Sequence, residues 1–260
     1  MLTFLMIGAH PDDMDLRASG LAMHVIKKGG SAVFLSATNG NAGHMAMDKE
    51  ALRLRRQRER EDAARVFGLR YDAFDIDDGY LTADIPTRDK LLRYIRAVRP
   101  DVIVTHRSCD YHPDHRALGQ LVCDCSYLIG VPLICPDAPA MRKAPVILFA
   151  EDPFTVPAPF RADVAVPCDD CIDRKIEGTL MHESQFYEWL PYDRNWTEVL
   201  DSKSRAEARA ALEDLLRKRF AGPVTRFPDR FPAGTRYGEV FQTDEYGGAM
   251  TEEIRSVLEA

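Results

Sequence analysis

The sequence predicts an α/β fold, a Rossmann-like and mostly parallel sheet with helices on both faces. Two observations predict it. Short segments of β-branched and apolar residues alternate with longer helical patterns through the first two-thirds of the 260-residue chain, as in folds built from strand–helix–strand units. Several of these short segments are apolar at nearly every position, which is typical of strands buried on both faces of a sheet.

The expected elements follow in order along the chain. We expect strands at Thr3–Gly8, 32–37, 71–76, 102–106 and Val146–Ala150, and helices at 16–28, Lys49–Phe67, 88–98 and Pro113–Leu128. Gly68 ends the second of these helices and Pro100 limits the third. Pro113 suits the first turn of the fourth helix, because proline has no backbone N–H to satisfy there.

The carboxy-terminal third has a weaker pattern. Residues 130–168 are rich in proline, and apart from one strand we expect surface loops that line a cleft. Helices are expected at 169–187 and 203–220, and a short strand at 237–242. The sequence contains no internal repeat and no linker, so we expect one domain over residues 1–260, with an elaborated carboxy-terminal third.

The composition excludes several classes of protein. There are 34 basic and 41 acidic side chains, a formal net charge of -7, which argues against nucleic acid as a partner because phosphate binding needs a basic face. The apolar start lacks the features of a signal peptide, and no apolar run approaches the roughly 20 residues that cross a bilayer. We therefore expect a cytoplasmic protein without a membrane span, with its six cysteines as free thiols. A homo-oligomer is left open.

Two short stretches of histidine and aspartate carry the candidate chemistry. GAHPDD covers residues 8–13 and DYHPDH covers residues 110–115, each just after an expected strand. Ligands of open α/β sheets bind at the carboxyl ends of the strands, so the two stretches are expected to face each other. A single such stretch is more often a turn that caps a helix. Two of them at equivalent strand ends favour a site with nitrogen and oxygen ligands for zinc or ferrous iron.

These stretches resemble the LmbE/PIG-L family of metal-dependent deacetylases, which act on N-acetylglucosamine-type substrates. The resemblance extends along most of the chain. It includes Thr38-Asn39-Gly40, Arg99-Pro100-Asp101-Val102, His182-Glu183-Ser184-Gln185 and Gly238-Glu239-Val240-Phe241. The resemblance implies the LmbE-like form of the α/β fold, and an N-deacetylase activity.

The resemblance also implies a metal site. Its motif assigns His10, Asp13 and His115 as the metal ligands, with Zn²⁺ as the expected cofactor and Fe²⁺ as the alternative. Three protein ligands leave coordination positions open for a water and for the substrate carbonyl. Amide hydrolysis needs a strong nucleophile at neutral pH, and a divalent metal supplies one by lowering the pKa of bound water to roughly 7.

Three further residues match the family's catalytic groups. Asp12 matches the general base, which accepts the proton of the water and then delivers it to the departing amine. His112, expected in its protonated form and oriented by Asp114, matches the group that stabilises the developing oxyanion. Hydrogen-bond donors of this kind are typically worth about 3 kcal/mol.

Substrate contacts are implied by the same resemblance. Arg56 and Asp78 match residues that hold sugar hydroxyls, and residues 41–44 form a loop over the cleft. His44 in this loop is a candidate substrate contact, with a solvent-exposed loop histidine as the alternative.

The chain departs from the family pattern at one point, because Met14 stands where the family usually has glutamate. Either Asp15 takes over the role of that acid or the role is dispensable. Two further features are left open. His182 lines the cleft or fixes the helix that carries it. An aromatic set forms a sugar-binding wall or, the favoured interpretation, a hydrophobic anchor or subunit contact; its members are Phe186, Tyr187, Trp189, Tyr192 and Trp196.

We therefore expect a zinc-dependent deacetylase that hydrolyses the N-acetyl amide of an amino sugar or glycoconjugate. An amidase that removes a larger acyl group is the nearest alternative. A nucleotide-binding protein is disfavoured, because the first strand-to-helix turn lacks the glycine-rich motif and has acids where a pyrophosphate would bind. A non-catalytic sugar-binding or metal-storage module predicts that Asp12 can be replaced without consequence.

Overall fold

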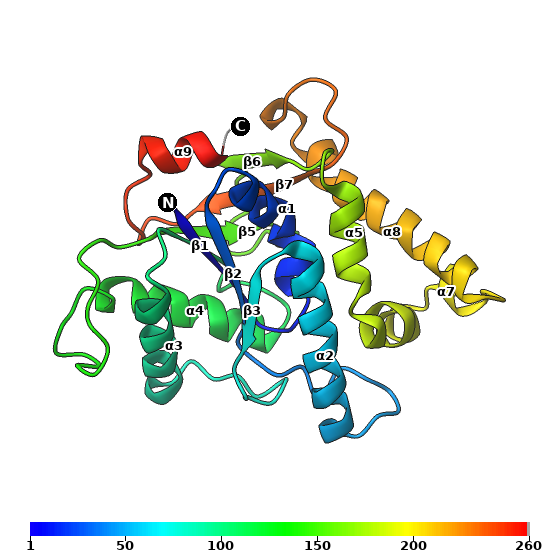
Figure 1. Cartoon of the computed structure of the whole chain (residues 1–260), viewed down its shortest axis with the longest axis horizontal. Coiled ribbons are helices and arrows are strands. Elements are labelled where there is room, and N and C mark those ends of the chain that lie inside the picture. The colour runs from blue at the N-terminus through cyan, green and yellow to red at the C-terminus, as the bar shows by residue number, and fades with distance from the viewer. Residues whose placement is uncertain (259–260) are drawn as a thin grey trace.

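A computed structural model describes residues 1–258, and in this part of the chain a 7-stranded sheet forms the centre (Figure 1). The strands are β1 (Thr3–Gly8), β2 (Ser31–Ser36), β3 (Arg70–Ala73), β4 (Val102–Thr105), β5 (Val146–Ala150), β6 (Val164–Pro167) and β7 (Gly238–Thr243). Their order across the sheet is β3-β2-β1-β4-β5-β7-β6. The first five strands are parallel, and β7 pairs antiparallel with both β5 and β6. The predicted fold class is confirmed.

Helices cover both faces of the sheet. The longer ones are α1 (Asp13–Lys27), α2 (Lys49–Phe67), α3 (Ile85–Val98), α4 (Pro113–Leu128), α5 (Ile172–Leu180) and α8 (Arg205–Arg226). The short ones are α6 (Leu190–Arg194), α7 (Thr197–Leu200), α9 (Glu252–Leu258), a π-helix at Ser184–Trp189 and a 3-10 turn at Pro228–Arg230. Helices α3 and α4 lie together on one side of the sheet, while α1, α2 and α5 lie on the other (Figure 1).

Helix boundaries follow from capping residues. Asp48 accepts a hydrogen bond from Ala51 N (2.9 Å) and begins α2, and Gly68 ends it in the left-handed conformation, with φ 76°. Asp84 caps α3 through Thr87 N (2.9 Å). Because such caps satisfy backbone N–H groups that have no partner within the helix, the sequence places these helices well.

The position of β1 determines where the site can form. β1 has β2 on one side and β4 on the other, and Met6 lies opposite Val104 in the parallel register. The chain leaves β1 to build one half of the sheet and later returns through β4 to build the other. Ligand sites form at such a switch point, outside the carboxyl ends of the strands, so the predicted location of the two motifs is confirmed.

The structure corrects the expectation of one helix at 169–187. Helix α5 ends at Leu180, and a π-helix begins at Ser184 after a turn. The Ser184 backbone N donates to the Glu59 carboxylate (2.7 Å), and the His182 ring lies against Asp15 (2.9 Å). These tertiary contacts fix a break that local helix propensity does not predict.

The carboxy-terminal third completes the sheet. The proline-rich region holds β6 besides the expected strand, and β7 lies between β5 and β6. Helix α8 extends to Arg226 through Pro223, six residues beyond the predicted end at 220. None of the helices within residues 1–258 has the length and apolar character needed to cross a membrane. The single-domain organisation and the cytoplasmic location stay predictions.

Candidate metal centre

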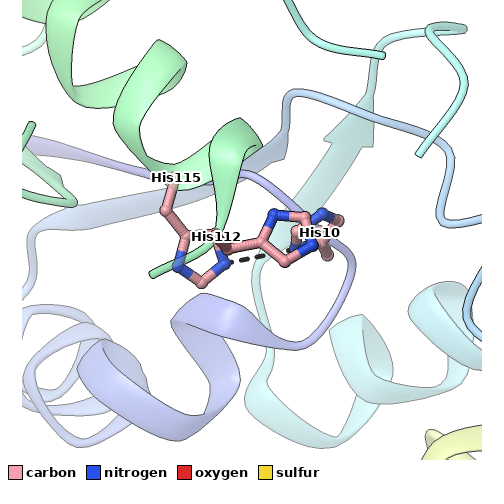
Figure 2. Close-up of side chains that lie close together, drawn as sticks. All are labelled: His10, His112 and His115. Atoms are coloured by element: carbon pink, nitrogen blue, oxygen red, sulfur yellow. Dashed lines mark hydrogen bonds between the residues drawn. The ribbon is translucent and has the colours of Figure 1, made fainter. Parts of the chain in front are cut away.

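Three histidines meet between the loop after β1 and the first turn of α4 (Figure 2). The ring of His10 lies 4.5 Å from that of His112 and 5.2 Å from that of His115, measured between ring centroids. His106, at the end of β4, stacks on His115 with a centroid separation of 4.0 Å. The two motifs therefore converge although about a hundred residues separate them in the sequence.

The three expected metal ligands form a small triangle. His10 Nδ1 lies 3.3 Å from His115 Nε2 and 3.5 Å from Asp13 Oδ2, and His115 Nε2 lies 3.4 Å from Asp13 Oδ1. A tetrahedral zinc ion with bonds of about 2.0–2.1 Å holds its ligand atoms about 3.3–3.4 Å apart. The residues present therefore fit a divalent cation.

Other histidine and aspartate side chains within residues 1–258 also lie close enough together to bind a metal ion. Besides the expected triangle, three overlapping sets bring their ligand atoms close together: His10, His112 and His115; Asp13, His106 and His115; and His10, Asp78 and Asp114. His106 Nε2 already accepts a hydrogen bond from Ala9 N (3.2 Å). His112 Nδ1 accepts one from Asp114 N (3.2 Å).

Carboxylates hold the two ligand histidines from behind. His10 Nε2 lies 3.1 Å from Asp114 Oδ2 and 3.2 Å from Asp78 Oδ1. His115 Nδ1 lies 3.1 Å from Asp110 Oδ2. In each ring one nitrogen faces a carboxylate and the other faces the triangle. Such carboxylate–histidine pairs set the ring orientation and tautomer at metal sites.

Electrostatics also suit a cation. Burial by itself lowers the pKa of His10, but hydrogen bonds to Asp114, Asp13 and Asp78 outweigh burial and raise this pKa well above its usual value. Burial opposes ionisation of Asp13, yet His115 and His106 hold the pKa of this carboxyl well below its usual value. The cluster therefore favours an added positive charge.

Asp12 lies beside the triangle in an unusual conformation. Its φ is 135°, in the region that favours glycine, so the backbone is strained at this residue. The Asp12 N–H donates to the Tyr71 hydroxyl (3.0 Å), and Arg56 Nη2 lies 3.2 Å from Asp12 Oδ2. Burial raises the pKa of Asp12, while the Arg56 charge opposes the rise. A carboxylate with a raised pKa is suited to accept and return a proton.

His112 differs from the expectation of a protonated ring oriented by Asp114. His112 is the N-cap of α4, and its Nδ1 accepts a hydrogen bond from Asp114 N (3.2 Å), which places the ring proton on Nε2. Burial and the neighbouring His10 and His115 lower the pKa of His112. A neutral His112 keeps an Nε2–H donor for an oxyanion.

The Asp114 carboxylate is engaged elsewhere. It accepts hydrogen bonds from Gly79 N (2.7 Å) and Leu81 N (3.2 Å) and contacts His10. Asp114 is the second residue of α4, and its side chain points from the first turn of this helix toward the loop at 79–81. It therefore orients His10 rather than His112.

The expected substrate residues have different surroundings. Arg56 is 2% exposed and donates to the Pro11 carbonyl as well as pairing with Asp12. Asp78 lies against His10, and His44 Nε2 lies 2.8 Å from Glu188. Contacts of Arg56, Asp78 and His44 with a sugar stay predictions.

The structure accounts for the departure at Met14. The Met14 side chain packs in the hydrophobic core. The buried Asp15 carboxylate accepts a hydrogen bond from the Tyr71 hydroxyl (2.8 Å) and lies 2.9 Å from His182 Nε2. Tyr71 therefore connects the Asp15 carboxylate to the backbone N–H of Asp12. His182 contacts the other oxygen of the Asp15 carboxylate. Tyr71 had no signal in the sequence, because it stands within an ordinary strand pattern.

The aromatic set divides into two groups. Phe186, Tyr187 and Trp196 pack with the apolar residues of α5 and α8 and anchor these helices. Trp189 and Tyr192 form a separate pair with ring centroids 6.0 Å apart. Trp189 approaches the loop at Gly43. The favoured interpretation, a hydrophobic anchor, is confirmed for the first group.

A family model described as PIG-L, GlcNAc-PI de-N-acetylase, matches residues 5–126. The match covers a little under half of the chain, and in these residues the chain is similar to the PIG-L family. The matched residues include both histidine–aspartate motifs and the whole candidate metal centre. Among curated proteins, none matches this chain.

Solved structures share the fold of nearly the whole chain, including the carboxy-terminal third. The N,N'-diacetylchitobiose deacetylase from Pyrococcus horikoshii is 19% identical with a TM-score of 0.74, covering 94% of this chain and 84% of its own. The 4-carboxy-2-hydroxymuconate hydratase from Pseudomonas putida is 18% identical with a TM-score of 0.72, and the match covers 97% of this chain and 99% of the hydratase. The zinc-inhibited form of teicoplanin deacetylase is 17% identical with a TM-score of 0.59, and the match covers 94% of this chain and 99% of the deacetylase. At these identities the likeness shows a shared fold.

Proposed function

We propose that this protein is a metal-dependent N-deacetylase that hydrolyses the acetamide of an N-acetylglucosamine-type amino sugar or glycoconjugate. The family match supports an N-deacetylase hydrolase. One observation carries the mechanism: His10, Asp13 and His115 present ligand atoms 3.3–3.5 Å apart, with the buried Asp12 carboxylate beside them.

In this proposal His10, Asp13 and His115 hold Zn²⁺, with Fe²⁺ as the alternative. When bound, the divalent cation supplies a nucleophilic water at neutral pH and polarises the amide carbonyl. Asp110 and Asp114 hold the two histidine rings so that one nitrogen of each faces the ion.

Two residues act on the substrate. Asp12 accepts the proton of the attacking water and returns it to the departing amine, which leaves as the free amino sugar while acetate forms. His112 donates its Nε2–H to the oxyanion that develops on the carbonyl oxygen. Arg56 favours the ionised form of Asp12, because its charge opposes the effect of burial on the pKa of that carboxyl.

The test is product analysis on substrates that differ only in the acyl group. N-acetylglucosamine and N-butanoylglucosamine are offered to the protein as purified, after chelation, and after return of Zn²⁺ or Fe²⁺. We expect acetate release to exceed butanoate release, to stop on chelation and to resume with the cation. Faster butanoate release would instead establish the larger-acyl amidase, and activity that survives complete metal removal would refute the proposal. The hydratase among the structural neighbours makes direct detection of acetate essential.

A further inference from the structure

A cavity of about 330 Å³ lies against the beginning of α1 and has no part in the proposed chemistry. Arg17 and Leu16 line it from α1, Arg219 and Phe220 from α8, and Val240 from β7. The wall is thus built from both the amino-terminal part of the chain and its carboxy-terminal third.

The cavity is one helical turn from the metal ligands. Arg17 follows Asp13 by four residues in α1, so both side chains lie on the same face of the helix, about 6 Å apart along its axis. The charge of Arg17 acts on His106 and Asp110, and the charge of Asp12 acts on Arg219. One small molecule could therefore occupy the metal centre and the cavity together.

The acidic side chains of the cavity wall are already neutralised. Each has a cationic partner; the pairs are Glu151 with Arg226 (3.0 Å), Asp152 with Arg107 (2.5 Å) and Glu239 with Lys175 (2.6 Å). The three ion pairs are therefore formed with cations other than Arg17 and Arg219, although the charges of both arginines also act on Glu151.

Two arginines of the wall have no carboxylate partner among residues 1–258. Arg17 Nη1 donates only to the backbone carbonyl of Glu151, and Arg219 makes no hydrogen bond or ion pair there. Arg219 is open to solvent. Two guanidinium groups thus share this recess, and neither forms an ion pair with a carboxylate within residues 1–258, although the charge of Glu151 acts on both.

We infer that Arg17 and Arg219 form a subsite for an anionic group, a carboxylate or a phosphate, carried by the substrate beyond its acetamide. Guanidinium groups bind both oxyanions through paired hydrogen bonds, and an anion relieves the repulsion between the two arginines. The inference rests on the proposed function, and it narrows the substrate class to acidic amino-sugar conjugates.

The first test measures anion binding without catalysis. Thermal unfolding is followed in sodium sulfate and in sodium chloride of equal ionic strength, for the wild type, Arg219→Gln and Arg209→Gln. Arg209 stands on the same helix and pairs with Glu213 at the surface, so it is the matched control. We expect sulfate to raise the Tm of the wild type and of Arg209→Gln by the same amount, and that of Arg219→Gln by less than half as much. An equal rise in all three proteins, or no rise in any, overturns the inference.

The second test compares substrates. N-acetylglucosamine 1-phosphate, N-acetylmuramate and the neutral methyl glycoside of N-acetylglucosamine carry a phosphate, a carboxylate and no charge. We expect wild-type kcat/KM to favour at least one anionic substrate over the neutral one by about tenfold or more. The ratio of kcat/KM for the anionic substrate to kcat/KM for the neutral one should fall about tenfold in Arg219→Gln. It should stay at the wild-type value in Arg209→Gln. The preferred anion distinguishes phosphate from carboxylate. An unchanged ratio in Arg219→Gln overturns the subsite. Hydrolysis of none of the three contradicts the proposed function, and the sulfate test then decides the subsite by itself.

Discussion

The guanidinium of Arg56 lies 3.2 Å from the carboxylate of Asp12, and only 2% of the arginine side chain and 14% of the aspartate side chain are exposed. Burial raises the pKa of Asp12 and the Arg56 charge opposes that rise. This pair links α2 to the strained residue before α1. It sets the protonation state of the proposed general base.

Replacement of Arg56 should therefore move the pH dependence of the reaction. Asp12 works as a base only when deprotonated, so activity is lost as the pH falls through its pKa. Without Arg56 that pKa rises further, and in Arg56→Met the acidic limb of kcat/KM should shift upward by roughly one pH unit or more. Arg53→Met, on the exposed side of the same helix, should keep the wild-type profile. A superimposable acidic limb in Arg56→Met would show that this pair does not tune the base.

Tyr71 connects two buried groups, so its hydroxyl should matter for both stability and rate. It accepts from Asp12 N and donates to Asp15 Oδ2. Tyr71→Phe leaves both without this partner and should cost about 1–3 kcal/mol of unfolding free energy, with kcat reduced more than KM is changed. Tyr127→Phe, at an 82% exposed tyrosine, serves as the control in chemical denaturation and kinetics. Equal stability and equal kcat in the two variants would contradict the relay from Asp15 to Asp12.

Asp110 should control metal affinity without being a ligand. Its carboxylate lies 3.1 Å from His115 Nδ1 and also accepts from His112 N (2.9 Å). Asp110→Asn should weaken metal binding by about 10–100-fold, measured by competition with a chelating dye. Asp124→Asn, at an exposed position of α4, the helix that carries His115, should bind the metal as the wild type does. Unchanged affinity in Asp110→Asn would remove Asp110 from the support of the site.

A buried ion pair joins the carboxy-terminal third to the amino-terminal helix. Lys175 Nζ lies 2.6 Å from Glu239 Oε1 with 0% and 3% of the side chains exposed, and the Glu239 carboxylate accepts from Gly20 N and Leu21 N. Removal of one partner leaves a buried charge, so Lys175→Met should destabilise the protein by about 3–5 kcal/mol. Lys27→Met, which breaks the exposed pair with Asp170, should change the unfolding free energy by less than about 1 kcal/mol. A similar loss of unfolding free energy in both variants would refute the structural role of the buried pair.

The sequence predicts the strands and helices that surround the site because their signals are local. Gly68 and Asp48 mark the ends of α2, and Pro113 marks the start of α4. The pairing of β7 with β5 and β6 could not be predicted in this way, since it depends on contacts between segments about 70 to 95 residues apart. The break before Ser184 depends likewise on Glu59, in a helix more than a hundred residues earlier.

The candidate site divides in the same manner. The position of the two motifs after strands predicts that they face each other, and the family resemblance implies that His10, Asp13 and His115 are the metal ligands. The partners of these residues come from elsewhere in the fold. Tyr71 reaches Asp12 from β3, and the Asp114 side chain contacts His10 instead of His112. Such contacts depend on side-chain direction, which the pattern of residues does not reveal.

The central claim is that Asp12 moves the proton while His10, Asp13 and His115 hold the cation. The most direct measurement is kcat for acetate release from N-acetylglucosamine in Asp12→Asn, with the bound metal determined in the same preparation. We predict a loss of about 10²-fold or more in kcat with the metal content of the wild type. Full activity in the metal-loaded variant would contradict the account, and it is the outcome that a non-catalytic role of Asp12 requires.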